Sequence, residues 1–340
     1  MLDPSGTVLE RKDLPTKCRK QIAAYFAAHG PDVQVAVESV DFYHWFWDTV
    51  KPNVRQLHLA DPAGVRACAG RRTKTDRNDS LLLAELLREN RLPMAYVPDE
   101  PVRALRELCR HRHRLARQFA LARRHLRWIG LKNNLPGPAT LTSDRAQKWL
   151  LTQESKLSAA HRLSGRQFVD QITTLERQLA DVEQVLQDTV AAHADLAPTL
   201  ALFQSVPGIG FITAITILCE CGDITRFDSI DELSSYAGLC PRVTQSGESA
   251  HHGHISKQGP PQLRWVLQQA AWVAIRCDPN ARRIYARIAK RAGSKKAATA
   301  LARKLLSYAW SVCRQGRPFV WPNTETKTGA APGPVWSYDI

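Results

Sequence analysis

The stretch RALRELCRHRHRLARQFALARRHLRWI, residues 103–129, decides the largest part of the fold. Its apolar side chains recur at intervals of three and four residues, which is the period of a helix that buries one stripe against a partner helix. The apolar positions of this stripe are Leu105, Leu108, Leu115, Phe119, Ala122, Leu126 and Ile129. Arg112 fills the one stripe position that is not apolar. We therefore predict a long helix that takes part in a coiled coil.

A second run with the same spacing follows a helix-breaking segment, Leu135-Pro-Gly-Pro-Ala139. Its apolar positions are Phe168, Ile172, Leu175, Leu179, Val182 and Leu186. We expect the two helices to pair, either within the chain or between protomers, because a heptad stripe fixes the contact and not the identity of the partner. Residues 98–196 are assigned to this basic, long-helix region.

The first of these helices is strongly basic between its apolar positions. The basic residues are Arg103, Arg106, Arg110, His111, His113, Arg114, Arg117, Arg123, Arg124, His125 and Arg127. Acidic partners at helical spacing are almost absent, so the charge is available for phosphates, although a solvated coiled-coil face is the simpler alternative. We select Arg110, Arg114, Arg117 and Arg124 as candidates for nucleic-acid binding.

Outside this region the chain changes character twice. Residues 1–97 alternate short apolar runs with amphipathic stretches, which predicts an α/β domain. We expect strands at Val33–Val37 and Val54–Leu59, and helices at Cys18–Ala28, Phe42–Val50 and Asp79–Glu89. Residues 2–10, LDPSGTVLE, are typical of one strand ending, a turn, and the next strand beginning. Residues 197–320 are predicted to be compact and helical, and residues 321–340 a disordered tail.

Composition limits the function. The 340 residues include 47 Lys and Arg against 32 Asp and Glu, a net charge of +15, which favours a polyanionic partner such as nucleic acid over a basic surface kept for solubility. The eight cysteines form no CxxC pair, so we expect reduced core thiols of a cytoplasmic protein and no zinc site. No apolar run reaches the length of a membrane span, and the N-terminal residues MLDPSGTVLERKD lack the apolar core of a signal peptide, so neither a membrane nor a secreted location is expected.

Three carboxylates are candidates for a metal site. Glu38 follows an apolar strand, where open α/β sheets place catalytic groups. Asp76 and Asp79 are three residues apart at a predicted helix start, about 60° apart on one face, and carboxylate oxygens suit Mg²⁺. The alternatives are a solvated strand end for Glu38 and a helix N-cap for Asp76.

The C-terminal region contains further candidates. Gly208 and Gly210 stand before an apolar helix, a pattern shared by helix-hairpin-helix DNA binders and by ordinary helix turns. Lys257 follows His251, His252 and His254, a stretch better suited to phosphate than to a metal. The last basic group is Arg282, Arg283, Arg287, Lys290, Arg291, Lys295, Lys296, Arg303 and Lys304, of which we select Lys295 and Lys296 for nucleic-acid binding. The nearby aromatics Trp265, Trp272 and Tyr285 are expected to be packing core more than stacking platforms.

Four motifs in fixed order resemble the insertion-sequence-110 family of transposases, over residue 1 to about residue 320. They are Val37-Glu-Ser39, Lys74-Thr-Asp-Arg-Asn-Asp79, Ser205-Val-Pro-Gly-Ile-Gly210, and Tyr236-Ala-Gly-Leu-Cys-Pro-Arg242 with Gln245-Ser-Gly-Glu-Ser249. The resemblance implies an RNase H-like domain similar to RuvC-type junction resolvases, with ligands Asp, Glu, Asp and Asp. Glu38, Asp76 and Asp79 match the last three, whereas the strand with the first Asp is expected to be missing here, and Asp3 lies in a turn and does not replace it.

The same resemblance assigns the remaining roles. Ser246 matches the serine that attacks a DNA phosphate, with Ser249 as a competitor, while a Ser-Gly dipeptide alone indicates only a turn. Arg242 lies in the last motif and is a further nucleic-acid candidate. The family implies Mg²⁺, target and donor double-stranded DNA, and a structured guide RNA, and the heptads favour a homodimer or homotetramer. The alternatives are a catalytically impaired nucleic-acid-binding protein and a metal-dependent junction nuclease.

Overall fold

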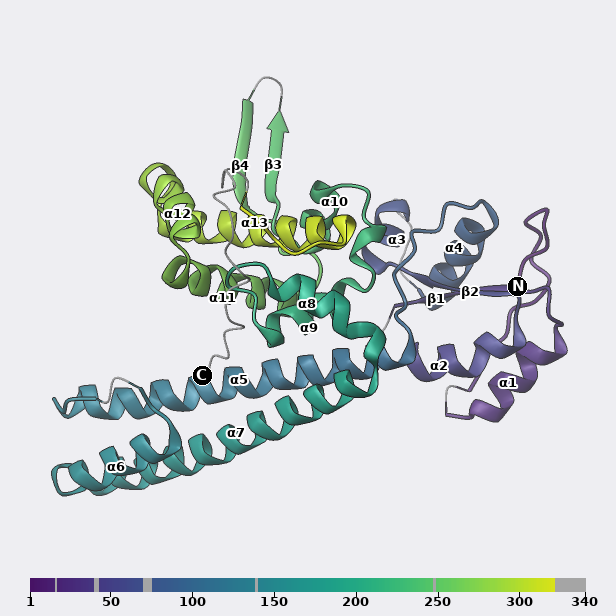
Figure 1. The fold of residues 1–340 in the computed structure, drawn as a ribbon. Helices are drawn as coiled ribbons and strands as arrows, with labels where there is room; N and C mark the ends of the chain where they lie inside the picture. Colours follow the sequence, from purple (N-terminus) through teal and green to yellow (C-terminus); the bar gives the residue numbers. More distant parts are fainter. Residues whose placement is uncertain (16, 40–42, 70–74, 138–139, 247–248, 322–340) are drawn as a thin grey trace. The chain divides into compact units, whose positions relative to one another are not determined.

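The computed structural model describes residues 1–340 except 16, 40–42, 70–74, 138–139, 247–248 and 322–340, and it leaves the side chains of 242–252 undescribed. The chain is mostly helical and divides into two compact units, Met1–Val97 and Pro98–Ile340 (Figure 1). Each unit is described by itself. The second includes both the long helices and the C-terminal region that the sequence divides at residue 196. All but one residue of the predicted tail, 321–340, lie outside the described residues.

The first unit combines a two-stranded parallel sheet with helices. Its elements are α1 (Arg19–Ala28), β1 (Gln34–Glu38), α2 (Tyr43–Val50), the 3-10 turn Lys51–Asn53, β2 (Gln56–Ala60), α3 (Pro62–Cys68) and α4 (Asp76–Arg88). Val35 lies beside Leu57 and Val37 beside Leu59 in the parallel register. Parallel strands need a crossover, which the segment containing α2 supplies. The predicted strands and helices are confirmed to within three residues, and the α/β character with them.

A small core holds this unit together. Leu82 and Leu86 of α4 pack with Ala60 of β2 and Leu92, and Ala36 of β1 lies against this cluster. The opening segment pairs through an antiparallel bridge between Leu2 and Val8, as its turn sequence predicts. Within the described residues the sheet has two strands, so the α/β class is observed while the more detailed RNase H-like assignment stays a prediction.

The second unit begins with a helical arm made of α5 and α7. The elements of the whole second unit are α5 (Glu100–Lys132), α6 (Ser143–Gln153), the 3-10 turn Glu154–Lys156, α7 (Ala159–Ala192), the 3-10 turn Ala194–Leu196, α8 (Ala197–Gln204), α9 (Phe211–Cys221), the 3-10 turn Ile224–Arg226, α10 (Ile230–Tyr236), β3 (Pro241–Ser246), β4 (Ser249–Ile255), α11 (Pro261–Cys277), α12 (Pro279–Ala292) and α13 (Ser294–Gln315).

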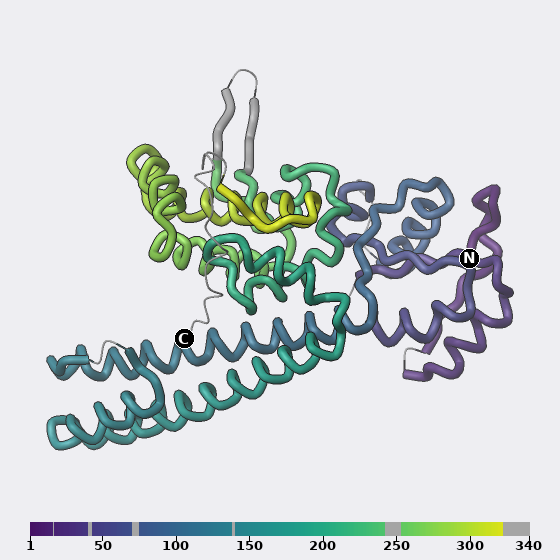
Figure 2. The backbone as a smooth tube through the Cα atoms, viewed as in Figure 1, coloured from purple at the N-terminus to yellow at the C-terminus, as the bar shows by residue number. Residues whose placement is uncertain are grey.

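The two long helices of the arm run side by side in opposite directions (Figures 1 and 2). Arg112 pairs with Glu183, His125 stacks on Phe168, and Asn133 Nδ2 lies 3.0 Å from His161 Nδ1, so later residues of α5 meet earlier residues of α7. The predicted stripes form this contact, with Leu126 and Ile172 fully buried. Of the two pairings that the sequence allows, the structure contains the one within the chain.

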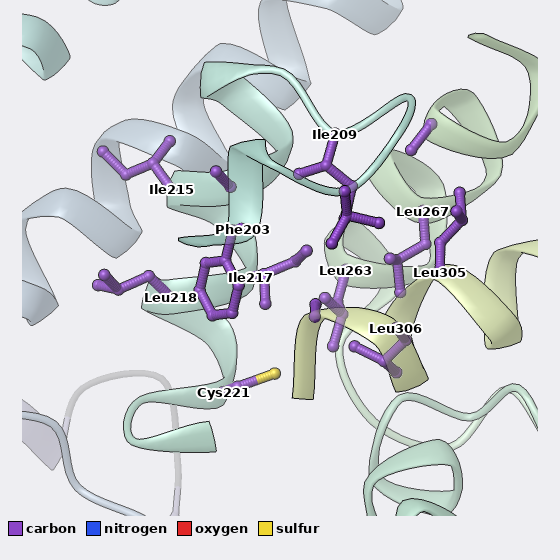
Figure 3. Close-up of a cluster of buried hydrophobic side chains, with 14 of the residues drawn as sticks. Phe203, Ile209, Ile215, Ile217, Leu218, Cys221, Leu263, Leu267, Leu305 and Leu306 are labelled. Carbon is purple, nitrogen blue, oxygen red and sulfur yellow. The ribbon is translucent and has the colours of Figure 1, made fainter. Parts of the chain in front are cut away.

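The C-terminal part of the second unit packs around α9. Every residue of α9 from Ala214 to Cys221 is buried, because α5, α8 and α11 cover it. Figure 3 shows Phe203 of α8 and Ile217 of α9 among the side chains of α11 and α13, such as Leu263 and Leu305. This apolar packing is large enough to hold the shorter elements that carry the candidate functional residues.

The cysteines are all unpaired, as the sequence predicts. Cys109, Cys219 and Cys221 are buried, but Cys68 and Cys277 are exposed, so the expectation that all are core thiols is wrong for these two. Among the described helices, none combines the length and apolar character that crossing a bilayer requires.

Candidate functional site

The candidate carboxylates of the first unit lie at the end of one element and the start of another. Glu38 is the last residue of β1 and is exposed. Asp76 and Asp79 occupy the first turn of α4, where the helix dipole favours negative charge. Thr75, and not Asp76, caps this helix, since its Oγ1 accepts a hydrogen bond from the Asn78 amide at 3.2 Å. The cap explains why α4 begins earlier than predicted and leaves the Asp76 carboxylate without a capping role.

The element arrangement and the donor atoms suit a divalent cation only in part. α4 packs against β1, so carboxylates come from two neighbouring elements, and their oxygens are the ligands that hard cations prefer. Within the described part of the chain, however, no three Asp, Glu, His or Cys side chains come close enough together to hold a metal ion. Glu38, Asp76 and Asp79 therefore do not form a complete metal site by themselves.

The candidate nucleophile belongs to an antiparallel hairpin. Ser246 is the last residue of β3 and pairs with Ser249, the first residue of β4. Their side chains, and that of Arg242, lie outside the described residues. Lys257, just after the hairpin, is exposed and has a left-handed backbone with φ +56°. The backbone thus places Ser246 at the end of a strand pair, as its Ser-Gly turn predicts.

The arginines of α5 divide into two groups. Arg110 donates from Nε and Nη2 to the two carboxylate oxygens of Glu220, both at 2.9 Å, and Glu220 is only 1% exposed. Arg106 adds a bond from Nε to the Cys219 carbonyl at 2.7 Å. The Glu220 carboxylate raises the pKa of Arg110. The donors of Arg110 therefore hold α5 to α9, and its role in nucleic-acid binding stays a prediction.

Other predicted cations on α5 differ in the same way. Arg114, Arg117 and Arg124 are exposed on the side of α5 opposite the buried stripe, in agreement with their prediction as accessible charges. His113 is buried against Trp265, with ring centroids 4.7 Å apart. Burial lowers the pKa of His113, and Arg117, Arg112 and Arg114 lower it further, so this imidazole does not contribute charge near neutral pH.

The two candidate glycines, Gly208 and Gly210, also have different surroundings. Gly208 has φ +84°, and a Cβ at this position would lie 2.4 Å from the Ala270 carbonyl oxygen of α11. Its close approach is therefore to another helix, and its role as a phosphate contact stays a prediction. Gly210 is exposed, is the N-cap of α9 and has no neighbour within 4 Å of a built Cβ. Gly210 alone keeps the open backbone that an anion needs.

The last basic group gathers on α12 and at the start of α13. Arg283, Arg287, Lys290, Arg291, Lys295 and Lys296 are exposed. Arg282 instead donates to the carbonyls of Ile275 and Arg276, at 3.0 and 2.7 Å. Trp272 is 40% exposed beside Tyr285, so the expectation that it belongs to the packing core is wrong. Trp265 does pack against α5.

Sequence reasoning missed Arg264 and Glu220. Arg264 Nη1 lies within 3.2 Å of the carbonyl oxygens of Ala237, Gln258 and Gly259. Glu220 is a lone acid in the apolar helix FITAITILCEC, and a buried charge of this kind requires a partner. That rule could have indicated an ion pair for Glu220, but no sequence pattern marks Arg264.

Two family models match the chain. The DEDD_Tnp_IS110 model, described as a transposase, matches residues 1–129, and the model described as "Transposase IS116/IS110/IS902 family" matches residues 200–286. These two matches define the class of protein as a DNA transposase, an enzyme that recombines DNA strands. The chain belongs to the IS110 family of transposases. The DEDD domain implies a dependence on divalent metal ions, and the family implies DNA substrates.

Curated relatives agree with this family. The pilin gene-inverting protein of Moraxella bovis is 28% identical over 270 residues, covering 78% of this chain and 74% of that protein. A protein of Pseudomonas aeruginosa named "Probable family 20 transposase" is 27% identical over 309 residues, 87% of this chain and 89% of that protein. The transposase for insertion sequence element IS1111A of Coxiella burnetii is 31% identical over 142 residues, 40% of this chain and 38% of that protein.

Proposed function

We propose that this transposase exchanges DNA strands through Ser246. The observation that carries the proposal is the pairing of Ser246 with Ser249 at the end of the β3–β4 hairpin, in a chain that two transposase models match over residues 1–129 and 200–286. The Ser246 Oγ attacks a phosphodiester, forming an Oγ–P bond while the P–O bond to the leaving sugar hydroxyl breaks. The serine proton passes to a base and the leaving oxygen takes up a proton. Attack by the hydroxyl of another strand reverses these steps and releases the serine.

We further propose that Glu38, Asp76 and Asp79 contribute oxygens to a Mg²⁺ site that other groups complete. A Mg²⁺ ion, when bound there, would supply positive charge against a DNA phosphate. The protein side chains would hold the carboxylate oxygens at the carboxyl end of β1 and the amino end of α4. The support is the position of these acids on two packed elements together with the DEDD family model.

The proposed partners follow from charge and family. The exposed basic residues of α5, α12 and α13 suit two double-stranded DNAs, target and donor, and a structured guide RNA. We propose Arg114, Arg117, Arg124, Gly210, Arg242, Lys257, Lys295 and Lys296 as contacts, a homodimer or homotetramer as the acting form, and the cytoplasm as its location. Strand exchange between two sites of one DNA would give inversion, the activity that the name of the Moraxella relative states for that protein.

The test uses Ser246→Ala in the full chain, mixed with the RNA encoded beside the gene, target DNA and donor DNA in Mg²⁺. We expect no recombined product and no covalent protein–DNA adduct, with DNA and RNA binding retained. Ser249→Ala is the matched control, at the residue that pairs with Ser246 in the hairpin, and should keep both products.

Three other results would each reject the serine mechanism. Full activity of Ser246→Ala would remove the residue from the reaction. Cleavage that needs metal and not Ser246 would identify a junction nuclease. Gel shifts without cleavage or adduct in the unaltered protein would identify a nucleic-acid-binding protein, the reading that the incomplete carboxylate set favours.

A further inference from the structure

The base of the β3–β4 hairpin is tied together outside the strands themselves. Pro241 and Ile255 are the last paired residues of the register. Below them, the Ser256 amide donates to the Cys240 carbonyl at 2.8 Å, and the Lys257 amide donates to the Gly238 carbonyl at 3.3 Å. The two chain segments that enter and leave the hairpin therefore continue to contact each other as far as α10 and α11.

Two glycines allow this contact to be unusually close. Gly238 has φ +67°, and a Cβ there would lie 2.0 Å from the Gln258 carbonyl oxygen. Gly259 has φ +83°, and a Cβ there would lie 1.9 Å from the Tyr236 carbonyl oxygen. A side chain at either position would force the segments apart, because its Cβ would overlap a carbonyl oxygen. L-residues also disfavour this backbone region. The crossing is backbone against backbone.

Arg264 closes the crossing. It lies in the first turn of α11, and its Nη1 is 3.2 Å from the Ala237 oxygen on the entering segment. The same nitrogen is 3.0 Å from the Gln258 oxygen and 2.9 Å from the Gly259 oxygen on the leaving segment. One guanidinium nitrogen thus joins both segments to a helix whose apolar face is in the main core, with Leu263 and Leu267 fully buried.

We propose that Arg264 is a positioning residue for the recombination reaction, which fixes the direction of the hairpin that carries Ser246. The inference rests on the proposed role of Ser246. Six residues of β3 at about 3.4 Å each extend roughly 17 Å from the base, so a rotation of about 10° at the base moves the strand end by about 3 Å. Misplacement of a nucleophile by about 1 Å already costs on the order of 100-fold in rate.

The experiment compares Arg264→Gln and Arg264→Lys with the unaltered full chain. Two measurements are made: amide hydrogen exchange at Ser256 and Lys257, and the rate of covalent adduct formation with a DNA substrate. We expect Arg264→Gln to speed exchange at both amides and to slow adduct formation about 100-fold, with the DNA dissociation constant changed less than about threefold. Lysine keeps the charge and can donate in one direction, so the exchange and adduct rates of Arg264→Lys should lie between those of Arg264→Gln and those of the unaltered chain. Arg276→Gln, at an exposed position in the last turn of the same helix, is the matched control and should change neither measurement.

Each outcome decides the proposal. Unchanged exchange in Arg264→Gln overturns it, and so does faster exchange with an unchanged adduct rate. If Arg264→Gln unfolds by circular dichroism, Arg264→Lys and Gly238→Ala decide by the same two measurements. Gly238→Ala leaves the sequence of α11 unchanged and disturbs the crossing, because its Cβ would lie 2.0 Å from the Gln258 oxygen and 2.8 Å from Arg264 Nη1. If the unaltered chain or Ser246→Ala shows that the serine is not used, the proposed function fails, and the exchange data still report whether Arg264 anchors the hairpin.

Discussion

Single residues of the same type perform opposite tasks on α5. Arg110 and Arg114 are one helical turn apart, yet Arg110 is bound to Glu220 and Arg114 faces solvent. A helical period can place residues on a face, but it cannot show that a carboxylate 110 positions later in the sequence will cover that face. The same limit applies to Gly208, whose neighbour Ala270 comes from a helix distant in sequence. Residue type and spacing therefore predict candidates, and tertiary contacts choose among them.

Glu220→Ala is expected to destabilise the second unit by about 3 kcal/mol, because it leaves the guanidinium groups of Arg106 and Arg110 near a buried position without their carboxylate. The free energy of unfolding in urea measures this loss. Glu107→Ala is the control, since Glu107 contacts Arg110 at 4.0 Å but is 58% exposed, and it should cost less than about 0.5 kcal/mol. Equal losses in the free energy of unfolding for Glu220→Ala and Glu107→Ala would show that the buried Glu220 pair stabilises the fold no more than an exposed pair does.

Among the elements, the helical arm is where sequence prediction succeeds most fully. Both long helices and their buried stripes follow from apolar spacing, and Arg112, the exception in the stripe, is buried and paired with Glu183 at 2.6 Å. The strands β1 and β2 were also predicted from short apolar runs. The choice of partner for the heptad stripe was not, because any second stripe of the same period satisfies it. Residue spacing also could not show whether the carboxylates come together, since that depends on how β1 and α4 are oriented, and among the described residues they do not form a complete site.

The exposed face of α5 supports a prediction about salt. Arg114, Arg117 and Arg124 share this face with Trp128, which is 56% exposed. Replacing the three arginines by alanine should weaken binding of structured RNA or duplex DNA and reduce the slope of log K against log salt by about 2 to 3, because each lost phosphate contact removes 0.7 to 0.9. Filter binding between about 50 and 200 mM salt measures the slope.

The control for the salt experiment is Arg91→Ala, at an exposed arginine of the first unit. It should leave the slope unchanged, since even one lost phosphate contact would lower it by about 0.7 to 0.9. A triple variant with an unchanged slope would mean that the α5 face does not contact phosphates, and the charge there would then serve solubility.

At the scale of the whole molecule, the buried apolar residues are divided unevenly. The described core cluster of the first unit contains four buried residues, Ala60, Leu82, Leu86 and Leu92, whereas those of the second unit extend along the arm and through α8, α9, α11 and α13. Stability follows the apolar area removed from water. The family was accessible from sequence because its motifs are short and keep a fixed order. The sequence separates residues 98–196 from 197–320, whereas the structure joins them in one unit.

We expect the first unit to open more readily than the second. Hydrogen exchange of the full chain should show weaker protection for the amides of β1 and β2 than for those of α9 and α11, by about tenfold or more. Divalent metal and DNA should reduce this difference in protection if the carboxylates take part in binding them, since ligands stabilise the state to which they bind. Equal protection in the free protein would contradict the uneven core.

The antiparallel pairing of α5 and α7 gives the arm a length that can be changed in fixed steps. The bonds from Arg106 and Arg110 to α9 lie near the start of α5, and the helix pair beyond Arg112 and Glu183 has its own apolar stripe. Seven residues added to each helix beyond that pair would keep every stripe in phase and lengthen the arm by about 10 Å. The reach of such an enzyme over its nucleic acids can therefore change in evolution, or by engineering, in steps of one heptad while the hairpin and the carboxylates stay as they are.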